Sequence, residues 1–457
     1  MVKQDVSWIN TFVNNIAPYV HVRKHDSLLI LVPNQAYMLN RTALDLLTRL
    51  LAGETVEEYL ELAGDTDLKR EDIHSFFCDL RALLMGCWRE GEERRAVETV
   101  EFSLPFNDLP VLSEIAVTYR CNLRCRFCYV GDSNRKRTDE RDMDLESLKK
   151  VLRVRRPDAD IPSVSFTGGE PTLLTYLEEA VAYAVELGLR VNLITNGTLL
   201  TKKRVTALKE AGLSSAQVSV EGPTAEIHDA LTMKKGSFDK TWAGIHNLRQ
   251  AGLVVHTNTT LSRKNAPFTE DIVRLAKEQG MERFSMNLAI PCGSALEYSR
   301  DVFYSYSEVS RLIPGLKRAA RQAGIEFLWY SPTPYCLFNP IAEGLGNKSC
   351  AACDGLLSIS PLGEVLPCSS FSQGVGNVLE KDFKTLWSSA LARFYQEKKY
   401  APAKCRDCEE FLPCQGACPL YWDAVGTAEL DGSVSVCLPE KMTVKEAPRD
   451  VHHAQIA

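Results

Sequence analysis

A repeating alternation of short apolar runs and amphipathic segments between residues 112 and 330 limits the fold of this chain more than any other feature. The runs are rich in β-branched residues and have the length of strands: Ile115–Val117, Val164–Phe166, Val191–Ile194, Val218–Val220, Val254–Thr260 and Phe284–Leu288. Segments between them, such as Leu148–Val154 and Leu174–Leu187, have helical spacing. The alternation predicts βαβ units and a parallel α/β sheet, which six such units could close into a full or partial barrel.

The first hundred residues have the pattern of a small separate domain. An apolar strand pair, Leu28–Val32 and Ala36–Leu39, flanks a turn. Three segments with helical character follow: Leu46–Leu51, a short segment opened by Thr55 and Glu58 as a capping box, and Ile73–Leu84. Two strands and three helices predict a winged-helix-like domain over residues 1–100. The turn-rich stretch Glu101–Leu112 then predicts a boundary, so we expect the parallel-sheet domain over residues 101–330.

Beyond about Tyr330 the alternation is lost, and proline and cysteine become frequent. Nine cysteines lie in this region: Cys336, Cys350, Cys353, Cys368, Cys405, Cys408, Cys414, Cys418 and Cys437. Cysteines clustered in loop-rich sequence indicate bound metal. The sequence therefore predicts a metal-bound domain over residues 331–457, with a tail after Glu440.

Composition excludes several other classes of protein. The formal net charge of −6 and the pI near 5.9 argue against nucleic acids or anionic membranes as partners. No apolar stretch approaches the roughly 18 residues of a membrane helix, and residues 1–8 lack the pattern of an export signal. The odd number of 15 cysteines argues against a disulfide framework. We therefore expect a cytoplasmic protein that uses clustered cysteines to bind metal.

The most specific chemical signal is the C-x3-C-x2-C loop of Cys121, Cys125 and Cys128, which follows the first predicted strand of the βαβ region. Three thiolates can hold three irons of a [4Fe-4S] cluster and leave the fourth iron without a protein ligand. A structural zinc site is the alternative, but it requires four ligands, usually in C-x2-C pairs. No fourth ligand lies nearby in the sequence, so the loop favours an iron–sulfur cluster with one open iron.

A second motif, made of Gly168, Gly169, Glu170 and Pro171, follows the second predicted strand. The two glycines allow the backbone to approach a ligand closely, and the carboxylate can accept hydrogen bonds from an ammonium group. Without the cysteine loop, an ordinary turn between a strand and a helix explains this motif about as well.

Together, the two motifs closely resemble the radical S-adenosylmethionine (SAM) superfamily, in which they occupy adjacent βα units of a partial TIM barrel. The resemblance implies that Cys121, Cys125 and Cys128 ligate the catalytic cluster, whose open iron chelates the amino and carboxylate groups of SAM. The Gly168–Pro171 strand end then receives the SAM amino group. Such enzymes take one electron, from a donor such as flavodoxin or ferredoxin, and cleave SAM to methionine and a 5'-deoxyadenosyl radical that removes a hydrogen atom from the substrate.

The resemblance extends to neighbouring positions. Phe127 corresponds to the aromatic residue of the cysteine loop near the SAM adenine, while Asn196 and Ser219, after the third strand and at the end of the fourth, are further expected SAM-binding residues. Relatives commonly carry Asp where Glu221 stands in this chain. His228 is typical of a capping or packing residue rather than a general base. No catalytic acid or base is predicted, because hydrogen-atom abstraction does not need one.

The cysteines near the C-terminus are similar to a SPASM domain, which holds auxiliary iron–sulfur clusters in peptide-modifying radical SAM enzymes. The similarity rests on Gly363 before Cys368 and on the C-x2-C-x5-C-x3-C run that starts at Cys405. By analogy, the first auxiliary cluster takes Cys368 and Cys418 with one or both of Cys350 and Cys353, and Cys336 is an additional candidate. The second takes Cys405, Cys408, Cys414 and Cys437. Paired zinc ribbons are the alternative.

The N-terminal domain resembles PqqD-like peptide-recognition domains, typified by the small chaperone of pyrroloquinoline quinone biosynthesis. Its strand, turn, Leu39-Asn40 and following helices carry the likeness. Such domains bind an extended leader peptide along a sheet edge, where backbone hydrogen bonds give affinity and side-chain pockets give specificity. A plain winged-helix fold that packs on the barrel or binds another protein is the alternative.

Together the resemblances imply a radical SAM/SPASM enzyme that crosslinks or oxidises a ribosomally made precursor peptide. It would hold one catalytic and two auxiliary [4Fe-4S] clusters. A radical SAM enzyme that acts on a non-peptide cofactor precursor, such as a tetrapyrrole, is the first alternative. The second alternative is a non-catalytic iron–sulfur or zinc protein, against which stands the incomplete three-cysteine loop beside Gly-Gly-Glu-Pro.

Overall fold

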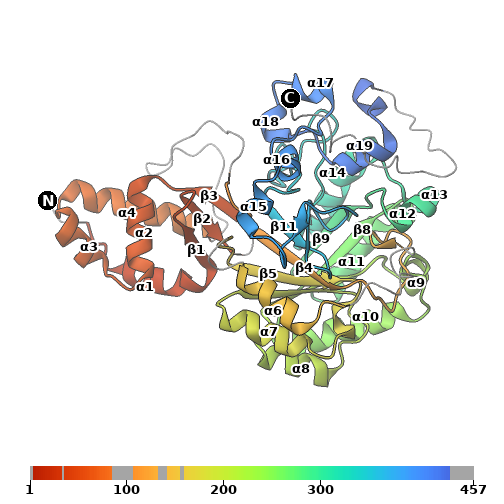
Figure 1. Cartoon of the computed structure of the whole chain (residues 1–457), viewed down its shortest axis with the longest axis horizontal. Coiled ribbons are helices and arrows are strands. Elements are labelled where there is room, and N and C mark those ends of the chain that lie inside the picture. Colours follow the sequence, from red (N-terminus) through yellow and green to blue (C-terminus); the bar gives the residue numbers. More distant parts are fainter. Residues whose placement is uncertain (1–3, 33–34, 85–106, 132–141, 155–158, 433–457) are drawn as a thin grey trace. The chain divides into compact units, whose positions relative to one another are not determined.

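The computed structural model describes residues 4–32, 35–84, 107–131, 142–154 and 159–432 of the 457-residue chain. The chain divides into two compact units, Met1–Val111 and Leu112–Ala457 (Figure 1). The predicted boundary at residue 100 lies outside the described residues. None of the helices in the described ranges is long and apolar enough to cross a membrane.

The first unit contains a three-stranded antiparallel sheet in the order β1-β2-β3, packed with helices. Its strands are β1 (Val20–Arg23), β2 (Leu28–Leu31) and β3 (Gln35–Met38). Its described helices are α1 (Trp8–Ile16), η1 (Ala17–Tyr19), α2 (Arg41–Leu51), α3 (Val56–Ala63) and α4 (Asp67–Leu84). The predicted strand pair and the three predicted helices are confirmed, and the structure adds α1 and β1.

Side-chain caps explain where two of these helices begin. Asn40 precedes α2 and accepts a hydrogen bond from the backbone N–H of Ala43 at 2.8 Å. Thr55 and Glu58 form the predicted capping box of α3: the Glu58 carboxylate accepts from the Thr55 backbone N–H at 2.8 Å, and the Thr55 hydroxyl accepts from the Glu58 N–H. The helix ends before Gly64, which has a φ of +86° that glycine adopts readily.

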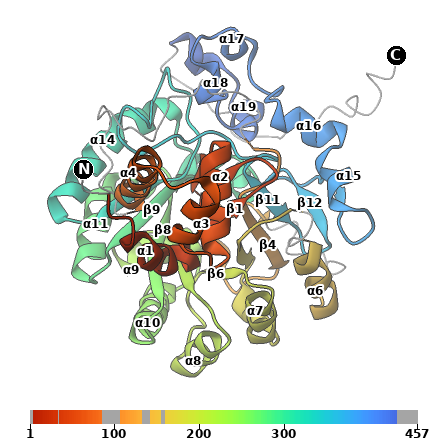
Figure 2. The same cartoon turned by 90° about the vertical axis from the view of Figure 1, so that its left-hand side faces the viewer.

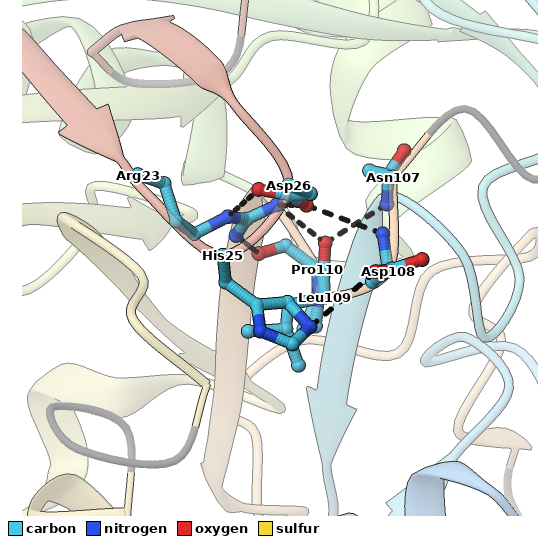
Figure 3. Close-up of polar contacts among 7 residues, drawn as sticks. All are labelled: Arg23, His25, Asp26, Asn107, Asp108, Leu109 and Pro110. Carbon is cyan, nitrogen blue, oxygen red and sulfur yellow. Dashed lines mark hydrogen bonds and ion pairs between the residues drawn. The ribbon is translucent and has the colours of Figure 1, made fainter. Parts of the chain in front are cut away.

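A fully buried arginine ties the sheet to the segment that leads toward the second unit (Figure 3). The Arg23 guanidinium donates to both carboxylate oxygens of Asp26, each at 2.8 Å. It also donates to the backbone carbonyls of Pro110 at 2.7 Å and Leu109 at 2.8 Å. Asp26 accepts a further bond from the Asp108 backbone N–H at 3.2 Å. The pair therefore satisfies backbone groups of residues 108–110 that would otherwise need other partners.

Replacing Arg23 by Met should destabilise the first unit by about 3–5 kcal/mol, because Asp26, with a side chain 6% exposed, would keep a buried charge without its partner. Arg49→Met is the matched control, since the Arg49–Glu54 pair is partly exposed and screened by solvent, so its loss should destabilise the unit much less. Hydrogen exchange of the β1 and β2 amides in the full chain measures the difference. Equal exchange rates in the two variants would contradict this account.

The second unit is built on a ten-stranded, mostly parallel sheet in the order β10-β9-β8-β7-β6-β5-β4-β11-β12-β13. The strands are β4 (Leu112–Thr118), β5 (Ser163–Gly168), β6 (Arg190–Thr195), β7 (Ser215–Ser219), β8 (Val254–Leu261), β9 (Arg283–Leu288), β10 (Glu326–Trp329), β11 (Leu356–Ile359), β12 (Glu364–Leu366) and β13 (Gly376–Asn377). All six predicted strands are confirmed as β4 to β9, and their pairing is parallel. Their carboxyl ends therefore lie along one edge of the sheet.

Helices connect the parallel strands and lie beside one another around them (Figure 2). The helices are α6 (Leu145–Val154), η2 (Pro171–Leu173), α7 (Leu177–Glu186), α8 (Lys202–Glu210), α9 (Ala225–Thr232), α10 (Ser237–Gln250), η3 (Ala266–Phe268), α11 (Thr269–Glu278), α12 (Ser294–Glu297), α13 (Ser299–Val302) and α14 (Tyr306–Ala323). The amphipathic segments predicted at Leu148–Val154 and Leu174–Leu187 correspond to α6 and α7. Strands β4 to β9 are neighbours in the order in which they occur along the chain, which is the βαβ arrangement that the sequence predicts.

The cysteine-rich region extends the central sheet, which the sequence did not indicate. Strand β11 pairs in parallel with β4, and β12 and β13 continue the sheet in antiparallel pairing. Short helices complete the region: α15 (Phe383–Trp387), α16 (Ala390–Gln396), α17 (Ala403–Arg406), α18 (Phe411–Cys414), α19 (Pro419–Val425) and η4 (Ala428–Asp431). The loss of βαβ alternation after Tyr330 thus reflects shorter strands, and pairing with the central sheet helps to organise this region.

Candidate functional site

The three cysteines of the C-x3-C-x2-C loop, Cys121, Cys125 and Cys128, follow the carboxyl end of β4 and are partly exposed. Ligands of open parallel sheets bind at this edge. The loop is therefore placed where both a cluster and a small molecule can reach it.

Backbone hydrogen bonds fix the shape of this loop from two sides. The N–H groups of Arg124 and Arg126 donate to carbonyls in the last turn of α9 at 3.1 and 2.9 Å. On the other side, the Ser294 N–H donates to the Cys128 carbonyl at 2.9 Å. These bonds do not involve the cysteine side chains, so the loop keeps its course whether or not the thiols bind iron.

Polar groups point toward the first thiol of the loop. The backbone N–H of Leu123 lies 3.4 Å from Cys121 Sγ, and the Asn196 amide nitrogen lies 3.9 Å from the same atom. The Asn196 amide also donates to Asn122 Oδ1 at 2.8 Å. Donors directed at sulfur stabilise a thiolate and tune an iron–sulfur cluster. The predicted site residue Asn196 therefore lies next to the cysteine loop.

The two glycines of the second motif are required by the backbone that carries the cysteine loop. A Cβ on Gly168, whose φ is +130°, would lie 2.1 Å from the Thr118 carbonyl oxygen. A Cβ on Gly169 would lie 2.1 Å from the Arg120 carbonyl oxygen. The Gly169 N–H donates to the Thr118 carbonyl at 2.7 Å. We expected these glycines to allow close approach of a ligand. In the structure, the close approach of the backbone of residues 118–120 is by itself enough to require glycine at both positions.

The Glu170 carboxylate is completely buried and joins the ends of β5 and β6. Its Oε1 accepts from the Thr172 N–H at 3.0 Å, the Thr172 hydroxyl at 2.5 Å and the Thr195 hydroxyl at 2.7 Å, while Oε2 accepts from the Asn196 N–H at 2.8 Å. Burial raises the pKa of Glu170, and these donors act in the opposite direction. The adjacent Pro171 is buried as the first residue of η2.

The two remaining predicted SAM-binding residues lie near the same edge. Phe127 packs against an apolar cluster that contains Leu231 and Ala289. Ser219 is the last residue of β7 and is partly exposed. The SAM contacts of Phe127, Asn196, Ser219 and the Gly168–Pro171 segment stay predictions.

Glu221 is a buried carboxylate near the same edge, which the sequence noted only for its departure from Asp. It lies just after β7, is 2% exposed, and accepts a hydrogen bond from the Thr260 N–H at 2.9 Å. Burial raises its pKa to about 8, and the Thr260 bond offsets part of this shift. His228 accepts from the Glu221 backbone N–H at 3.1 Å, and burial lowers the pKa of its imidazole to about 4. His228 thus packs beside Glu221 as an uncharged residue, as expected.

The raised pKa of Glu221 predicts a specific pH dependence of stability. The fold favours the protonated carboxyl, so this contribution is fully present below the ordinary pKa of 4.5 and is lost as pH rises through about 8. Between pH 5 and pH 8 the unfolding free energy of the native chain should fall by about 3 kcal/mol relative to Glu221→Gln, which does not ionise. Urea unfolding of both proteins across this range measures the difference. Parallel pH profiles would contradict the assignment.

Four cysteines of the C-terminal region form a first group: Cys350, Cys353, Cys368 and Cys418. Burial, and next the charges of Cys350 and Cys418, raise the pKa of the Cys368 thiol. Burial and then Cys350 raise the pKa of Cys353 to about 12. The same two causes raise the pKa of the Cys418 thiol well above its ordinary value. The thiols therefore lie within electrostatic reach of one another, and a bound cation would favour their deprotonation.

A buried lysine supports this first group. Lys398 Nζ donates to the Cys350 carbonyl at 2.8 Å and to Asp354 Oδ2 at 2.7 Å. The lysine side chain is fully buried, so the pair fixes the backbone at Cys350.

A second group contains Cys405, Cys408 and Cys414 on α17, α18 and the turn between them. Cys437, the expected fourth ligand, lies outside the described residues. Within the described ranges, no three His, Cys, Asp or Glu side chains converge on a position for a single metal ion. The cysteine loop and both groups offer thiols as the side chains that could bind iron, and donors directed at Cys121 suit a thiolate ligand, so the residues fit iron–sulfur clusters.

Comparison with known proteins agrees with this chemistry. Residues 115–276, from β4 to α11, match the radical SAM superfamily, and residues 350–409 match the SPASM iron–sulfur cluster-binding domain. The AdoMet-dependent heme synthase of Oleidesulfovibrio alaskensis is 30% identical over 321 residues, which cover 66% of this chain and 80% of that protein. The subtilosin biosynthesis protein AlbA of Bacillus subtilis is 24% identical over 403 residues, which cover 83% of each chain.

The fold is also similar to that of Streptococcus suis SuiB bound to its precursor peptide SuiA, with a TM-score of 0.64 and 18% identity over 93% of this chain and 98% of that one. A mostly parallel α/β sheet with a three-cysteine loop at its carboxyl edge and further cysteine groups beyond it defines an iron–sulfur enzyme. The chain belongs to the radical SAM superfamily. It is a radical SAM/SPASM enzyme whose cofactors are [4Fe-4S] clusters and SAM.

Proposed function

We propose that this enzyme modifies a ribosomally made precursor peptide, and that the leader of the peptide binds to the edge of the three-stranded sheet in the first unit. The observation that carries this proposal is the open edge of β3. In the sheet order β1-β2-β3, no other strand in the described ranges pairs with that edge. An extended peptide can add to such an edge as a further strand.

The register of the sheet tells which backbone groups face the open edge. Leu39 N–H donates to the Ser27 carbonyl at 2.8 Å, and Tyr37 lies opposite Leu29. Because bonding alternates along an antiparallel pair, Tyr37 bonds toward β2, and the N–H and C=O groups of Ala36 and Met38 point outward. Met38 is 53% exposed, so a peptide can reach these groups.

Several features support a peptide substrate. We take residues 1–100 as the proposed PqqD-like, winged-helix-like domain, and the three-stranded sheet with its helices in the first unit supports this proposal. SuiB, which the chain resembles in fold, was solved with its precursor peptide, and AlbA is named for bacteriocin biosynthesis. PqqA peptide cyclases are further relatives, one from Xanthomonas euvesicatoria at 29% identity. The peptide would be processed by a partial (β/α)6 barrel over residues 101–330, followed by a SPASM domain over residues 331–457.

In this proposal, Cys121, Cys125 and Cys128 hold the catalytic cluster, and the Gly168–Pro171 segment receives SAM beside it. Held by these three thiols, a [4Fe-4S] cluster would supply the one-electron reduction that cleaves SAM, with a flavodoxin or ferredoxin as the expected electron donor. The chain positions these groups through Glu170, which ties the end of β5 to β6, and through Asn196, which lies against both Cys121 and Glu170. Auxiliary clusters on the C-terminal cysteines would accept an electron from the substrate or hold it.

An iron porphyrin is the second candidate substrate, because the heme synthase relative reaches 30% identity. The alignment to that relative leaves about a third of this chain unmatched. A porphyrin has no leader peptide, so a unit that binds a leader would have no role with that substrate. The presence of the first unit therefore favours a peptide substrate over a porphyrin.

The test is to offer both substrate classes to the anaerobically reconstituted enzyme with SAM and a reductant. The probes are synthetic peptides encoded by short reading frames beside the gene, and iron coproporphyrin. We expect a peptide that loses a pair of hydrogen atoms by mass spectrometry while 5'-deoxyadenosine accumulates. A modified porphyrin with unmodified peptides would refute the peptide proposal.

A further inference from the structure

Exposed basic side chains flank the cysteine loop at the carboxyl edge of the central sheet. They are Arg124 in the loop, Lys202 and Lys203 at the start of α8, and Lys234 and Lys235 in the turn before α10. We call this group the basic rim. None of its members forms an ion pair with a described residue, whereas the neighbouring Arg204 pairs with Glu178 at 2.5 Å. In a chain of net charge −6, the rim is a local excess of positive charge.

The lysines before α10 are tied to one side of the cysteine loop. The Arg124 backbone N–H donates to the Thr232 carbonyl at 3.1 Å, and the Lys234 backbone N–H donates to the Asp229 carbonyl at 3.2 Å. The Asp229 carboxylate is occupied by backbone N–H groups at the start of α10 and makes no ion pair with the rim. Lys234 and Lys235 therefore lie beside the loop with their charges unpaired.

The lysines that open α8 are tied to the loop through Asn122. The Asn122 side-chain amide donates to the Thr198 hydroxyl at 2.8 Å, and α8 begins at Lys202 in the segment that continues from Thr198. Thr201 caps this helix by accepting from the Arg204 backbone N–H at 3.3 Å. One pair of lysines thus follows the contact at Asn122, and the other follows the contact at Arg124.

The placement of Lys202 and Lys203 is unfavourable for the helix that carries them. The N-terminus of a helix has a partial positive charge, which disfavours cations in the first turn, and the first turn of α8 contains no acidic residue. Because α8 connects the carboxyl end of β6 to the amino end of β7, its positive end lies at the same edge as the cysteine loop. The helix and the two lysines therefore add to one positive potential, which indicates a role other than folding.

The basic rim surrounds the thiols at which an electron has to arrive. Cys121, Cys125 and Cys128 are partly exposed, and a [4Fe-4S] cluster held by them would need one electron before SAM is cleaved. A protein that delivers an electron binds weakly and leaves again, and such encounters depend on complementary charge for their rate and orientation. A positive surface around the loop suits a carrier with an acidic surface.

We propose that the basic rim is the docking surface for an acidic one-electron carrier protein, of which flavodoxin is the expected example. In the docked pair, one electron passes from the reduced carrier to the oxidised cluster, and no bond forms or breaks. An acidic peptide segment is the competing occupant, but the exposed cysteines inside the rim favour the carrier. The inference rests on the electron donor of the proposed function and not on the substrate, so a failure to modify peptides would leave it standing.

Binding of oxidised flavodoxin to the reconstituted full chain tests the proposal without any assay of activity. Fluorescence anisotropy of labelled flavodoxin measures the affinity at low and at physiological salt. Lys202→Glu combined with Lys203→Glu should weaken binding about tenfold or more at low salt and make the affinity less dependent on salt. These changes place carboxylates where the helix dipole favours them, so α8 should keep its stability. Lys381→Glu combined with Lys384→Glu, at exposed lysines near α15, is the control of equal charge change and should bind like the native chain.

A second pair of substitutions tests the other side of the loop. Lys234→Glu combined with Lys235→Glu should also weaken flavodoxin binding, and both pairs should slow SAM cleavage driven by flavodoxin but not by dithionite, which needs no docking surface. Native affinity in both pairs, or an equal loss in the control, would overturn the proposal. Weaker binding of the precursor peptide with native binding of flavodoxin would also overturn it and assign the rim to the peptide.

Discussion

Replacing Cys121, Cys125 and Cys128 together by Ala should abolish SAM cleavage while the auxiliary iron remains. The three thiols are the cluster ligands in this account, so about four of about twelve irons per chain should be lost. Formation of 5'-deoxyadenosine under reductant should fall to the rate measured without enzyme. Iron counting together with chromatography of the SAM products measures both effects.

The structure explains why this change should act on the cluster and not on the fold. The backbone of the loop is held by bonds from Arg124 and Arg126 to α9 and from Ser294 to Cys128, none of which uses a cysteine side chain. The control is Cys78→Ala, which removes an exposed thiol from the first unit. If the triple variant still forms 5'-deoxyadenosine, the assignment of these three cysteines to the catalytic cluster is wrong.

The second large effect is expected at the open edge of β3. Met38→Pro removes a backbone N–H that points outward, and proline is tolerated on edge strands because no ladder bond is lost. Binding of the precursor peptide should weaken about tenfold or more, since a lost backbone hydrogen bond of about 1 kcal/mol is joined by the steric bulk of the ring. Fluorescence anisotropy of a labelled leader peptide measures the affinity.

Met38→Ala is the matched control for this prediction. It removes the exposed side chain but keeps the N–H, so strand addition should persist with an affinity within a few fold of the native chain. Equal binding by Met38→Pro and the native chain would mean that the leader does not pair with β3. SAM cleavage measured in the absence of peptide serves as the folding control. If Met38→Pro also loses this activity, the substitution has damaged the whole chain.

Strand and helix positions in the second unit were predictable from the spacing of the apolar residues. This spacing changes along the chain between the two-residue period of a strand and the 3.6-residue period of a helix. The same reasoning could have found α1, where Ile9, Val13 and Ile16 recur on one buried face. Strands β11, β12 and β13 have only four, three and two residues. Strands this short do not show a recognisable alternation of apolar and polar residues. They are identified as strands only by their pairing in the sheet beside β4.

The chemistry of the site was predictable where it depends on local spacing. The cysteine loop and the Gly168–Pro171 motif are each contiguous in sequence, and the structure places them at neighbouring strand ends. Contacts across the fold were not predictable: the Glu170 carboxylate meets Asn196, and Tyr335 meets Cys414. The high pKa of Glu221 likewise arises from burial, which no local pattern specifies.

The proposed function requires that a precursor peptide supplies the hydrogen atom that the 5'-deoxyadenosyl group of SAM takes up. The most direct measurement uses the reconstituted enzyme with SAM, a reductant and a peptide substrate whose carbon-bound hydrogens are replaced by deuterium. The account predicts deuterium in the 5'-deoxyadenosine, detected by mass spectrometry. The opposite result would contradict a peptide substrate: no deuterium in the 5'-deoxyadenosine when the peptide is labelled, and deuterium when an iron porphyrin is labelled.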